Sequence, residues 1–147
     1  MGERHYIQPT AADRLFNSLA AGLTRLGVSL YGSRILAVRG RKSGTWRTVP
    51  VNLLELGGAR YLVAPRGETE WVRNLRVSGA GELRLGARRE SFTATEIADA
   101  EKIPILRAYI AKWWFEVKRF FDLPGPHAPD SEIARIASNH PVFRIET

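Results

Sequence analysis

The sequence predicts an α+β protein, mainly β, built as a partly closed antiparallel β-barrel of about six strands with flanking helices. Short segments rich in β-branched and aromatic residues alternate with glycine turns. Helical patterns stand towards both ends of the chain, and one more is inserted between strands. With 147 residues and no low-complexity linker, we expect one domain over residues 1–147.

The first predicted element is an N-terminal helix over residues 10–26. Thr10 is a suitable N-cap, and Asp13 stands where a capping box has its acid. One face of this helix carries a leucine stripe at spacings of four, four and three, made of Leu15, Leu19, Leu23 and Leu26. Core packing is the favoured interpretation, and the alternative is a helix that lies on a membrane or covers a substrate site.

Three strands are predicted next, over residues 33–40, 45–56 and 59–64. The second, "TWRTVPVNLLEL", is long and rich in β-branched residues. Pro50 has no N–H for a strand ladder, so it marks an edge or a bulge. Gly57 and Gly58 form a tight turn into the third strand.

A short helix follows over residues 69–79. Thr69 is the predicted cap, Glu70 stands in the first turn, and Gly79 ends the helix. The segments "ELRLG" and "ESFTATEI" then alternate as strands and pair in a hairpin that turns over Gly86 and Ala87.

The C-terminal third is predicted to be helical until its last strand. A long helix covers residues 99–121, with Pro104 near its start. Asp130 caps a short helix, "SEIARIAS". The segment "PVFRIE" closes the chain as the sixth strand.

The charge distribution indicates a surface that faces an anion. The net charge is +7 and the sequence pI is about 10.4. No carboxylate occurs between Asp13 and Glu55, a stretch that holds Arg14, Arg25, Arg34, Arg39, Arg41, Lys42 and Arg47. The candidates for the anion are a nucleic acid, a membrane surface and a small phosphorylated ligand. A solvated basic face without a ligand is the alternative.

Most catalytic classes are excluded by missing residues. The chain has no cysteine, so disulfides, thiolate catalysis and cysteine-bound zinc are ruled out. His5, His127 and His140 have no ligand-like spacing, so we expect no metal site. There is no G-x-S-x-G or S-x-x-K motif, and "GRKSG" is not a P-loop. If the protein is an enzyme, a bound coenzyme carries the chemistry.

The N-terminus and hydropathy predict a cytoplasmic location. Glu3 and Asp13 interrupt the N-terminal region, which has no continuous apolar run typical of a signal peptide. No apolar stretch is long enough to span a bilayer.

The stretch "GRKSGTWRTVPV", residues 40–51, is the strongest candidate binding element. A turn at Lys42, Ser43 and Gly44 would expose backbone N–H groups, a hydroxyl and cations together, as a phosphate or carboxylate cradle does. Gly44 permits the positive φ that such a turn requires. Arg47 returns towards the same region from the next strand. An ordinary basic β-turn is the alternative interpretation.

Three motifs together resemble a known family. The chain has "GRKSG-x-x-R-x-x-P", then "YLVAPRG", then "WVRNL", over about residues 35–97, and the closing "HPVFRI" is compatible. This combination is similar to the deazaflavin-dependent nitroreductase family, which consists of split β-barrel oxidoreductases that use coenzyme F420. The resemblance therefore implies a split antiparallel β-barrel and hydride transfer by the coenzyme, with no catalytic side chain required.

The resemblance also implies site residues. Matched to the family's motifs, the coenzyme contacts are Arg41, Lys42, Ser43, Arg47, Thr48, Pro50, Ala64, Pro65, Arg66, Gly67, Trp71 and Asn74. The aromatic helix offers Tyr109 and Trp113 for the acceptor. Pro65 replaces a hydroxyl residue of relatives, and Arg66 replaces a lysine. The family's tyrosine-rich C-terminal segment is not reproduced, so acceptor choice does not carry over.

The function implied is transfer of a hydride from reduced coenzyme F420 to an apolar small-molecule acceptor, such as a quinone, an enone or a nitroaromatic. A membrane contact through the N-terminal helix goes with this interpretation, and oligomeric state is not predicted. One rival is a basic β-barrel that binds single-stranded nucleic acid, with Trp46 and Tyr61 as stacking platforms. Another is an oxidoreductase of the same fold that uses flavin mononucleotide.

Overall fold

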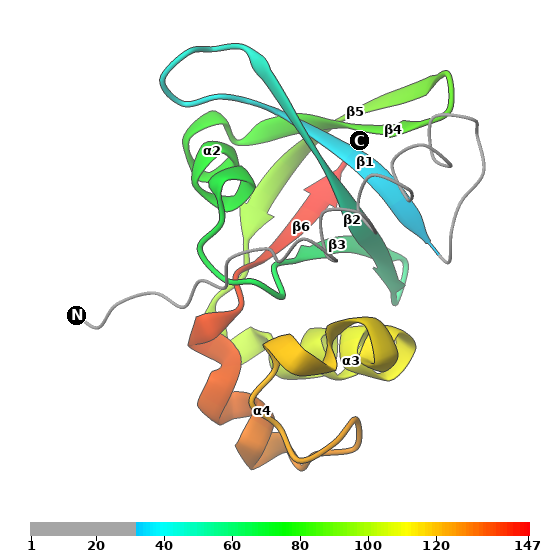
Figure 1. Ribbon diagram of the computed structural model, residues 1–147, viewed down its shortest axis with the longest axis vertical. Coiled ribbons are helices and arrows are strands. Elements are labelled where there is room, and N and C mark those ends of the chain that lie inside the picture. Colours follow the sequence, from blue (N-terminus) through cyan, green and yellow to red (C-terminus); the bar gives the residue numbers. More distant parts are fainter. Residues whose placement is uncertain (1–31) are drawn as a thin grey trace.

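The computed structural model describes residues 32–147, so the helix predicted over residues 10–26 lies outside the described part. Within that part, six strands form one closed antiparallel barrel in the order β1-β2-β3-β6-β5-β4 (Figure 1). The predicted class, a mainly β split barrel with flanking helices, is confirmed. The strands are β1 (Ser33–Arg39), β2 (Trp46–Leu56), β3 (Ala59–Val63), β4 (Ala80–Leu85), β5 (Arg88–Glu96) and β6 (Val142–Glu146).

The two halves of β2 have different neighbours. From Leu53 to Leu56, β2 pairs with β3 alone. Between Trp46 and Asn52 it pairs only with β1, and Pro50 stands opposite Ile35. Pro50 therefore lies in a strand with one open edge, where its missing N–H costs no ladder bond. The predicted edge position is confirmed, and this edge becomes one wall of the pocket described below.

The helices occupy two places around the barrel. Helix α2 (Glu70–Ser78) connects β3 to β4 and packs against β1. All other described helical segments lie between β5 and β6, and Figure 1 places α3 and α4 together at one end of the barrel. They are η1 (Asp99–Glu101), α3 (Ile103–Val117), η2 (Lys118–Phe120), α4 (Asp130–Ile136) and η3 (Ala137–Asn139).

The continuous helix predicted over residues 99–121 is wrong. A proline is tolerated only in the first turn of a helix, and α3 begins with Pro104 in that turn, after the separate 3₁₀ turn η1. A second interruption falls at Trp113, whose φ of −123° and ψ of 22° are not helical. Its indole is 1% exposed and packs on Tyr109, with ring centroids 5.0 Å apart. The segment then ends in the 3₁₀ turn η2.

Two predicted helix caps also differ from the structure. Pro129 is the N-cap of α4, and Asp130 is its first helical residue, where a carboxylate still favours the positive end of the helix dipole. Thr69 does stand at the N-cap of α2, but its side chain makes no capping hydrogen bond. Gly79 ends α2 in the left-handed conformation, with φ of 68°, as predicted.

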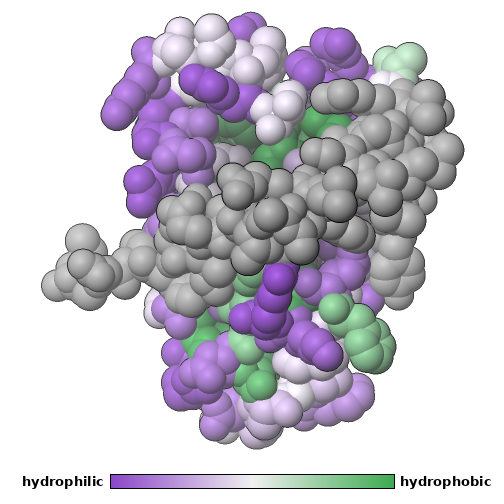
Figure 2. Space-filling model, viewed as in Figure 1, coloured by the Kyte–Doolittle hydropathy of each residue, from purple (hydrophilic) through white to green (hydrophobic). Residues whose placement is uncertain are grey.

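Two hydrophobic clusters hold these elements together. One fills the barrel and includes Leu36, Leu62 and Phe143; the other joins the barrel to α3 and α4 and includes Leu106, Trp113 and Ile133. Figure 2 shows hydrophobic side chains recessed between hydrophilic ones on this face of the described part. Over residues 32–147, no helix is long and apolar enough to cross a membrane.

Candidate functional site

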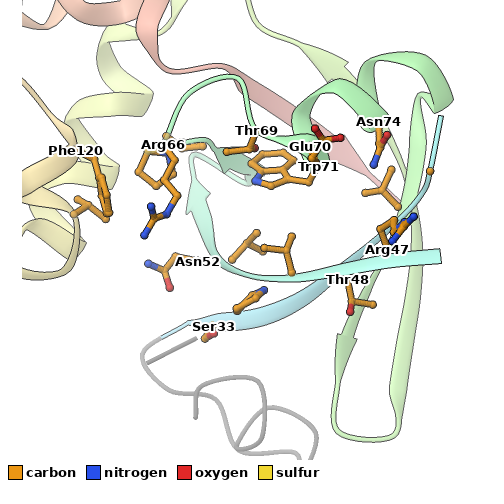
Figure 3. Close-up of a pocket in the computed structure, with 18 of the residues that line it drawn as sticks. Ser33, Arg47, Thr48, Asn52, Arg66, Thr69, Glu70, Trp71, Asn74 and Phe120 are labelled. Carbon is orange, nitrogen blue, oxygen red and sulfur yellow. The ribbon is translucent and has the colours of Figure 1, made fainter. Parts of the chain in front are cut away.

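A pocket of about 760 Å³ lies between the open edge of β2, the start of α2 and the end of α3 (Figure 3). At one end stand the loop between β1 and β2 and the first residues of β2, together residues 40–48. At the other stand Arg66, Tyr109 and Phe120. We call these the loop end and the helix end. Apolar side chains of the β2 edge connect them, so the pocket is elongated and changes in character along its length.

The loop end is a tight, internally bonded turn. The Gly44 N–H donates to the Gly40 carbonyl at 2.8 Å, and the Gly40 N–H donates to the Thr45 carbonyl at 2.8 Å. Gly44 has φ of 73°, a conformation that favours glycine. The Ser43 and Thr45 hydroxyls lie 2.8 Å apart. The predicted turn with a positive φ at Gly44 is confirmed.

Asn74 of α2 anchors this loop to the rest of the pocket. Its Oδ1 accepts hydrogen bonds from the Arg41 N–H at 3.0 Å and from Arg41 Nη1 at 2.9 Å. The same guanidinium pairs with Glu70 Oε2 at 2.7 Å. This hydrogen bond from Arg41 lowers the pKa of Glu70. Asn74 is 3% exposed, so the anchor is fixed, and much of Arg41 serves to hold the loop.

Two other cations of the loop end face outwards. Lys42 and Arg47 are exposed, line the pocket, and make no ion pair within residues 32–147. The Ser43 and Thr48 hydroxyls stand beside them in the same wall. Uncompensated positive charge with nearby donors suits a phosphate or a carboxylate. The pocket is not free of carboxylates, however, because Glu70 and Glu116 also line it.

The middle of the pocket is a slot between β2 and α2. Val49, Pro50 and Val51 contribute the β2 side, and Trp71 contributes the α2 side. Figure 3 shows the Trp71 indole facing across this slot. Above it, the Thr69 Oγ1 atom is buried and has no hydrogen-bond partner among the described residues. A buried polar atom without a partner is costly, so a ligand atom that bonds it there would be stabilised.

The helix end combines arginines with aromatic rings. The Arg66 guanidinium carbon lies 4.4 Å from the Phe120 ring centroid, and that of Arg119 lies 4.8 Å from it. Figure 3 shows Arg66 extending between Phe120 and Asn52. Tyr109 also lines this end and is only 2% exposed. Burial raises the pKa of Tyr109 well above its usual range, so its hydroxyl keeps its proton.

Most of the predicted site residues are brought together here. Those that line the pocket are Arg41, Lys42, Ser43, Arg47, Thr48, Pro50, Pro65, Arg66, Trp71, Asn74 and Tyr109. Ala64, Gly67 and Trp113 are buried and do not line it. The Ala64 N–H bonds the Pro141 carbonyl at 2.9 Å, which ties its segment to β6.

Several lining residues were not predicted. They are Asn52 on β2, Thr69 and Glu70 at the start of α2, and Glu116, Arg119 and Phe120 near the end of α3. Helical spacing could have found one of them, because Glu116 lies two turns after Tyr109 on the same face. Strand alternation could have found Asn52, two residues after Pro50. No local signal indicates that the end of α3 meets the β2 edge.

The two aromatic rings predicted to stack on nucleic-acid bases are already in contact with other side chains. Trp46 is 39% exposed, but the Arg39 guanidinium carbon lies 4.1 Å from its ring centroid and that of Arg84 lies 5.5 Å from it. Tyr61 is partly buried and packs on the cluster under α3. Among the described residues, no group of three or more potential ligands is arranged to hold a metal ion.

Comparisons with solved structures agree on the fold. A domain-swapped dimer matches with a TM-score of 0.56 and 18% identity, covering 92% of this chain and 93% of its own. An F420-H2 dependent reductase matches with a TM-score of 0.52 and 20% identity, covering 78% and 94%. A heme binding protein from Mycobacterium smegmatis matches with a TM-score of 0.50 and 15% identity, covering 95% and 52%. At these identities the likeness shows the fold alone. No curated protein matches the sequence significantly.

Fold and site together define a class: a split-barrel protein whose elongated pocket offers cations at one end and an apolar slot beyond them. The sequence narrows that class, because the family model for F420H(2)-dependent quinone reductases matches residues 16–119. The chain therefore belongs to the F420H(2)-dependent quinone reductase family, whose coenzyme is reduced F420. The resemblance stated from its motifs is confirmed.

The residues of the pocket fit that coenzyme. Its phosphodiester and glutamyl groups are anionic and match Lys42 and Arg47. Its flat ring needs an apolar slot of the kind formed by Pro50, Val51 and Trp71. The Thr69 hydroxyl, which has no hydrogen-bond partner among the described residues, leaves a polar group at that slot for a ligand atom.

Proposed function

We propose that this protein transfers a hydride from reduced coenzyme F420 to an apolar, carbonyl-bearing acceptor of the quinone type. One observation supports this best: a single pocket joins the exposed cations Lys42 and Arg47 to an apolar slot and then to a second, aromatic end. An anionic coenzyme with a flat ring has a place for its tail and its ring, and space remains for a second flat molecule.

Each part of the chain has a distinct task in this proposal. Lys42, Ser43, Arg47 and Thr48 hold the anionic part, while Arg41 is fixed by Asn74 and Glu70 and shapes the loop. The slot beside Pro50 and Trp71 orients the ring and excludes water. The bound coenzyme supplies the hydride. Acceptors enter at the helix end, near Tyr109 and Phe120.

Acceptor preference follows from the lining of the helix end. Its aromatic and apolar side chains favour flat, poorly water-soluble molecules over small polar ones. Pro65 stands in the pocket where relatives of this family can present a hydroxyl, so it offers nothing to a nitro group. Quinones and enones are therefore expected to be reduced faster than nitroaromatic compounds.

The direct test is a titration followed by kinetics. Quenching of coenzyme fluorescence measures F420 affinity, with flavin mononucleotide as the competitor that represents the rival coenzyme. Steady-state turnover with menadione and with a nitroimidazole then measures acceptor choice. Tight F420 binding and faster menadione turnover are expected. Equal or tighter binding of flavin mononucleotide would refute the coenzyme assignment, and a preference for the nitroimidazole would refute the acceptor assignment.

A contact with a membrane surface through residues 10–26 remains part of this proposal. In the described part, Phe115 is 89% exposed at the end of α3, close to the basic residue Lys118. Exposed aromatic and basic residues favour the surface of an anionic bilayer. Deleting the residues before Ser29 should reduce co-sedimentation with anionic vesicles and raise the acceptor KM more than it lowers coenzyme affinity. Unchanged sedimentation and kinetics would leave the segment a scaffold only.

A further inference from the structure

Glu116, at the end of α3, contributes a carboxyl group to the pocket wall. It lines the helix end together with Tyr109 and Phe120. Within residues 32–147 its carboxylate has no ion pair and no hydrogen bond, although Lys112 and Arg119 lie one turn before and after it.

Neighbouring carboxylates contrast with Glu116 because each has a cationic partner. Asp130 pairs with Arg107, and both Asp122 and Glu132 pair with Arg135. The second carboxylate of the pocket, Glu70, pairs with Arg41. A carboxyl left without such a partner in a cleft is a candidate for function rather than stability.

The position of the group lets it exchange a proton between pocket and water. The residue as a whole is exposed, which gives its carboxyl access to solvent. Burial nevertheless raises the pKa of Glu116, so part of its environment is the pocket wall. Its charge also contributes to the raised pKa of Tyr109, so the two groups lie within electrostatic reach. Glu116 therefore holds a proton to higher pH than an ordinary glutamate and can regain it from water.

Reduction of a quinone by a hydride needs one proton. The hydride brings both electrons and one hydrogen, and it leaves a hydroquinone anion with its charge on oxygen. That oxygen must take up a proton to give the neutral hydroquinone. The donor must stand at the acceptor's end of the pocket and be able to ionise near neutral pH. Tyr109 is there too, but burial disfavours its ionised form.

We infer that Glu116 is the acid that protonates the reduced acceptor, an assignment that rests on the function proposed above. The O–H bond of its carboxyl breaks and an O–H bond of the hydroquinone forms. The carboxylate that remains takes a proton from solvent. Tyr109 keeps its proton and donates a hydrogen bond to the second acceptor oxygen.

The other charged groups at this end favour the same step. Arg66 comes from the segment before α2 and Arg119 from η2, and both line the pocket; Lys112 lies on α3 beside Glu116. All three are cations. Arg66 and Arg119, which line the pocket, stabilise the anionic oxygen that precedes protonation.

The test compares Glu116→Gln with Glu116→Asp and with Glu101→Gln, an exposed control outside the pocket. With menadione as acceptor, wild-type kcat should fall as pH rises through the pKa of Glu116, because the protonated form is lost. Glu116→Gln should lower kcat at least about tenfold and remove this pH dependence, since general acids contribute about 10²–10⁴-fold. Glu116→Asp should restore part of both. The F420 dissociation constant should stay within about threefold of wild type, because Glu116 lies at the helix end of the pocket and not at the loop end.

A second measurement does not depend on turnover. Carboxyl ¹³C titration of the protein without coenzyme should show a resonance that titrates above the ordinary glutamate value of about 4.3 and that is absent from Glu116→Gln. A glutamine variant that keeps wild-type kcat and pH profile overturns the assignment while the proposed function stands. Absence of F420 binding in the wild type overturns the proposed function itself, and the inference with it.

Discussion

The two ends of the pocket are built in different ways. The loop end comes from one continuous stretch, residues 40–48, fixed by its own backbone hydrogen bonds and by a single buried residue, Asn74. The helix end is assembled from Asn52, Arg66 and the segment 109–120, which are far apart in the chain. Its contacts are ring and cation stacking instead of backbone hydrogen bonds.

From this difference we expect the loop end to determine the affinity for the coenzyme and the helix end to determine the selectivity for the acceptor. A locally folded turn with exposed cations recognises charge, which any member of an anionic ligand class carries. A wall assembled from separate elements recognises shape, and small shifts of one element change which molecule fits. Changes at the loop end should therefore act on coenzyme binding, and changes at the helix end on the acceptor.

The largest effect is expected at the loop end. Lys42→Ala and Arg47→Ala should each weaken F420 binding by about ten- to a hundredfold, as charged hydrogen bonds contribute about 1.5–3 kcal/mol. Both residues are exposed, so the fold should be unchanged. Fluorescence titration measures the affinity. The control is Arg88→Ala, an exposed arginine outside this pocket. If both pocket variants bind as tightly as this control, the cations do not hold the coenzyme.

A smaller effect is expected when the loop loses its anchor. Asn74→Ala leaves the Arg41 N–H without its acceptor, which should lower the unfolding free energy by about 1–3 kcal/mol and the F420 affinity by about tenfold. Asn74→Asp keeps an acceptor oxygen and should retain more of both. Chemical denaturation and coenzyme titration on the two variants test this order. A reversed order would mean that Asn74 contributes its amide group to the ligand instead.

The next prediction tests the helix end alone. Phe120→Leu removes the ring stacked by Arg66 and Arg119 while keeping an apolar side chain. Because cation–π contacts at exposed sites contribute about 0.5–1 kcal/mol, the acceptor KM should rise about two- to fivefold. F420 affinity should change less than threefold, because Phe120 lies at the helix end and the cations that hold the coenzyme lie at the loop end. A variant that loses coenzyme affinity and keeps its acceptor KM would contradict the division between the ends.

The smallest effect concerns the pH dependence of stability. Burial raises the pKa of Tyr109 above that of an unfolded tyrosine, so the stability it contributes is present below pH 10 and is lost as pH rises beyond it. Because an unfolded tyrosine has a pKa of about 10, its contribution at that pH is already reduced by about 0.4 kcal/mol. Tyr109→Phe should lose less stability than wild type between pH 8 and pH 10.5. Parallel loss in both proteins would show that the tyrosine ionises freely in the folded state.

Local sequence patterns were enough to predict the strands and the loop end. Strand alternation, the glycine turns and Pro50 at an open edge are local consequences of backbone geometry, and all are present in the structure. The turn at Gly44 and the cations beside it are equally local, because the backbone hydrogen bonds of the turn join Gly40 to Gly44 and to Thr45. The motif "GRKSG-x-x-R-x-x-P" in this stretch contributed to the family resemblance, because a locally folded loop can be read from its own sequence.

The helix end, in contrast, depends on the packing of elements that are far apart in the chain. The sequence predicted one long helix to residue 121, but the burial of Trp113 coincides with a break, and the last turns bring Glu116 and Phe120 to the pocket. Tyr109 and Trp113 were expected to act together, yet one lines the pocket and the other lies in the core. Which face of a helix meets a strand that is distant in the chain depends on packing between whole elements, and no local pattern encodes that.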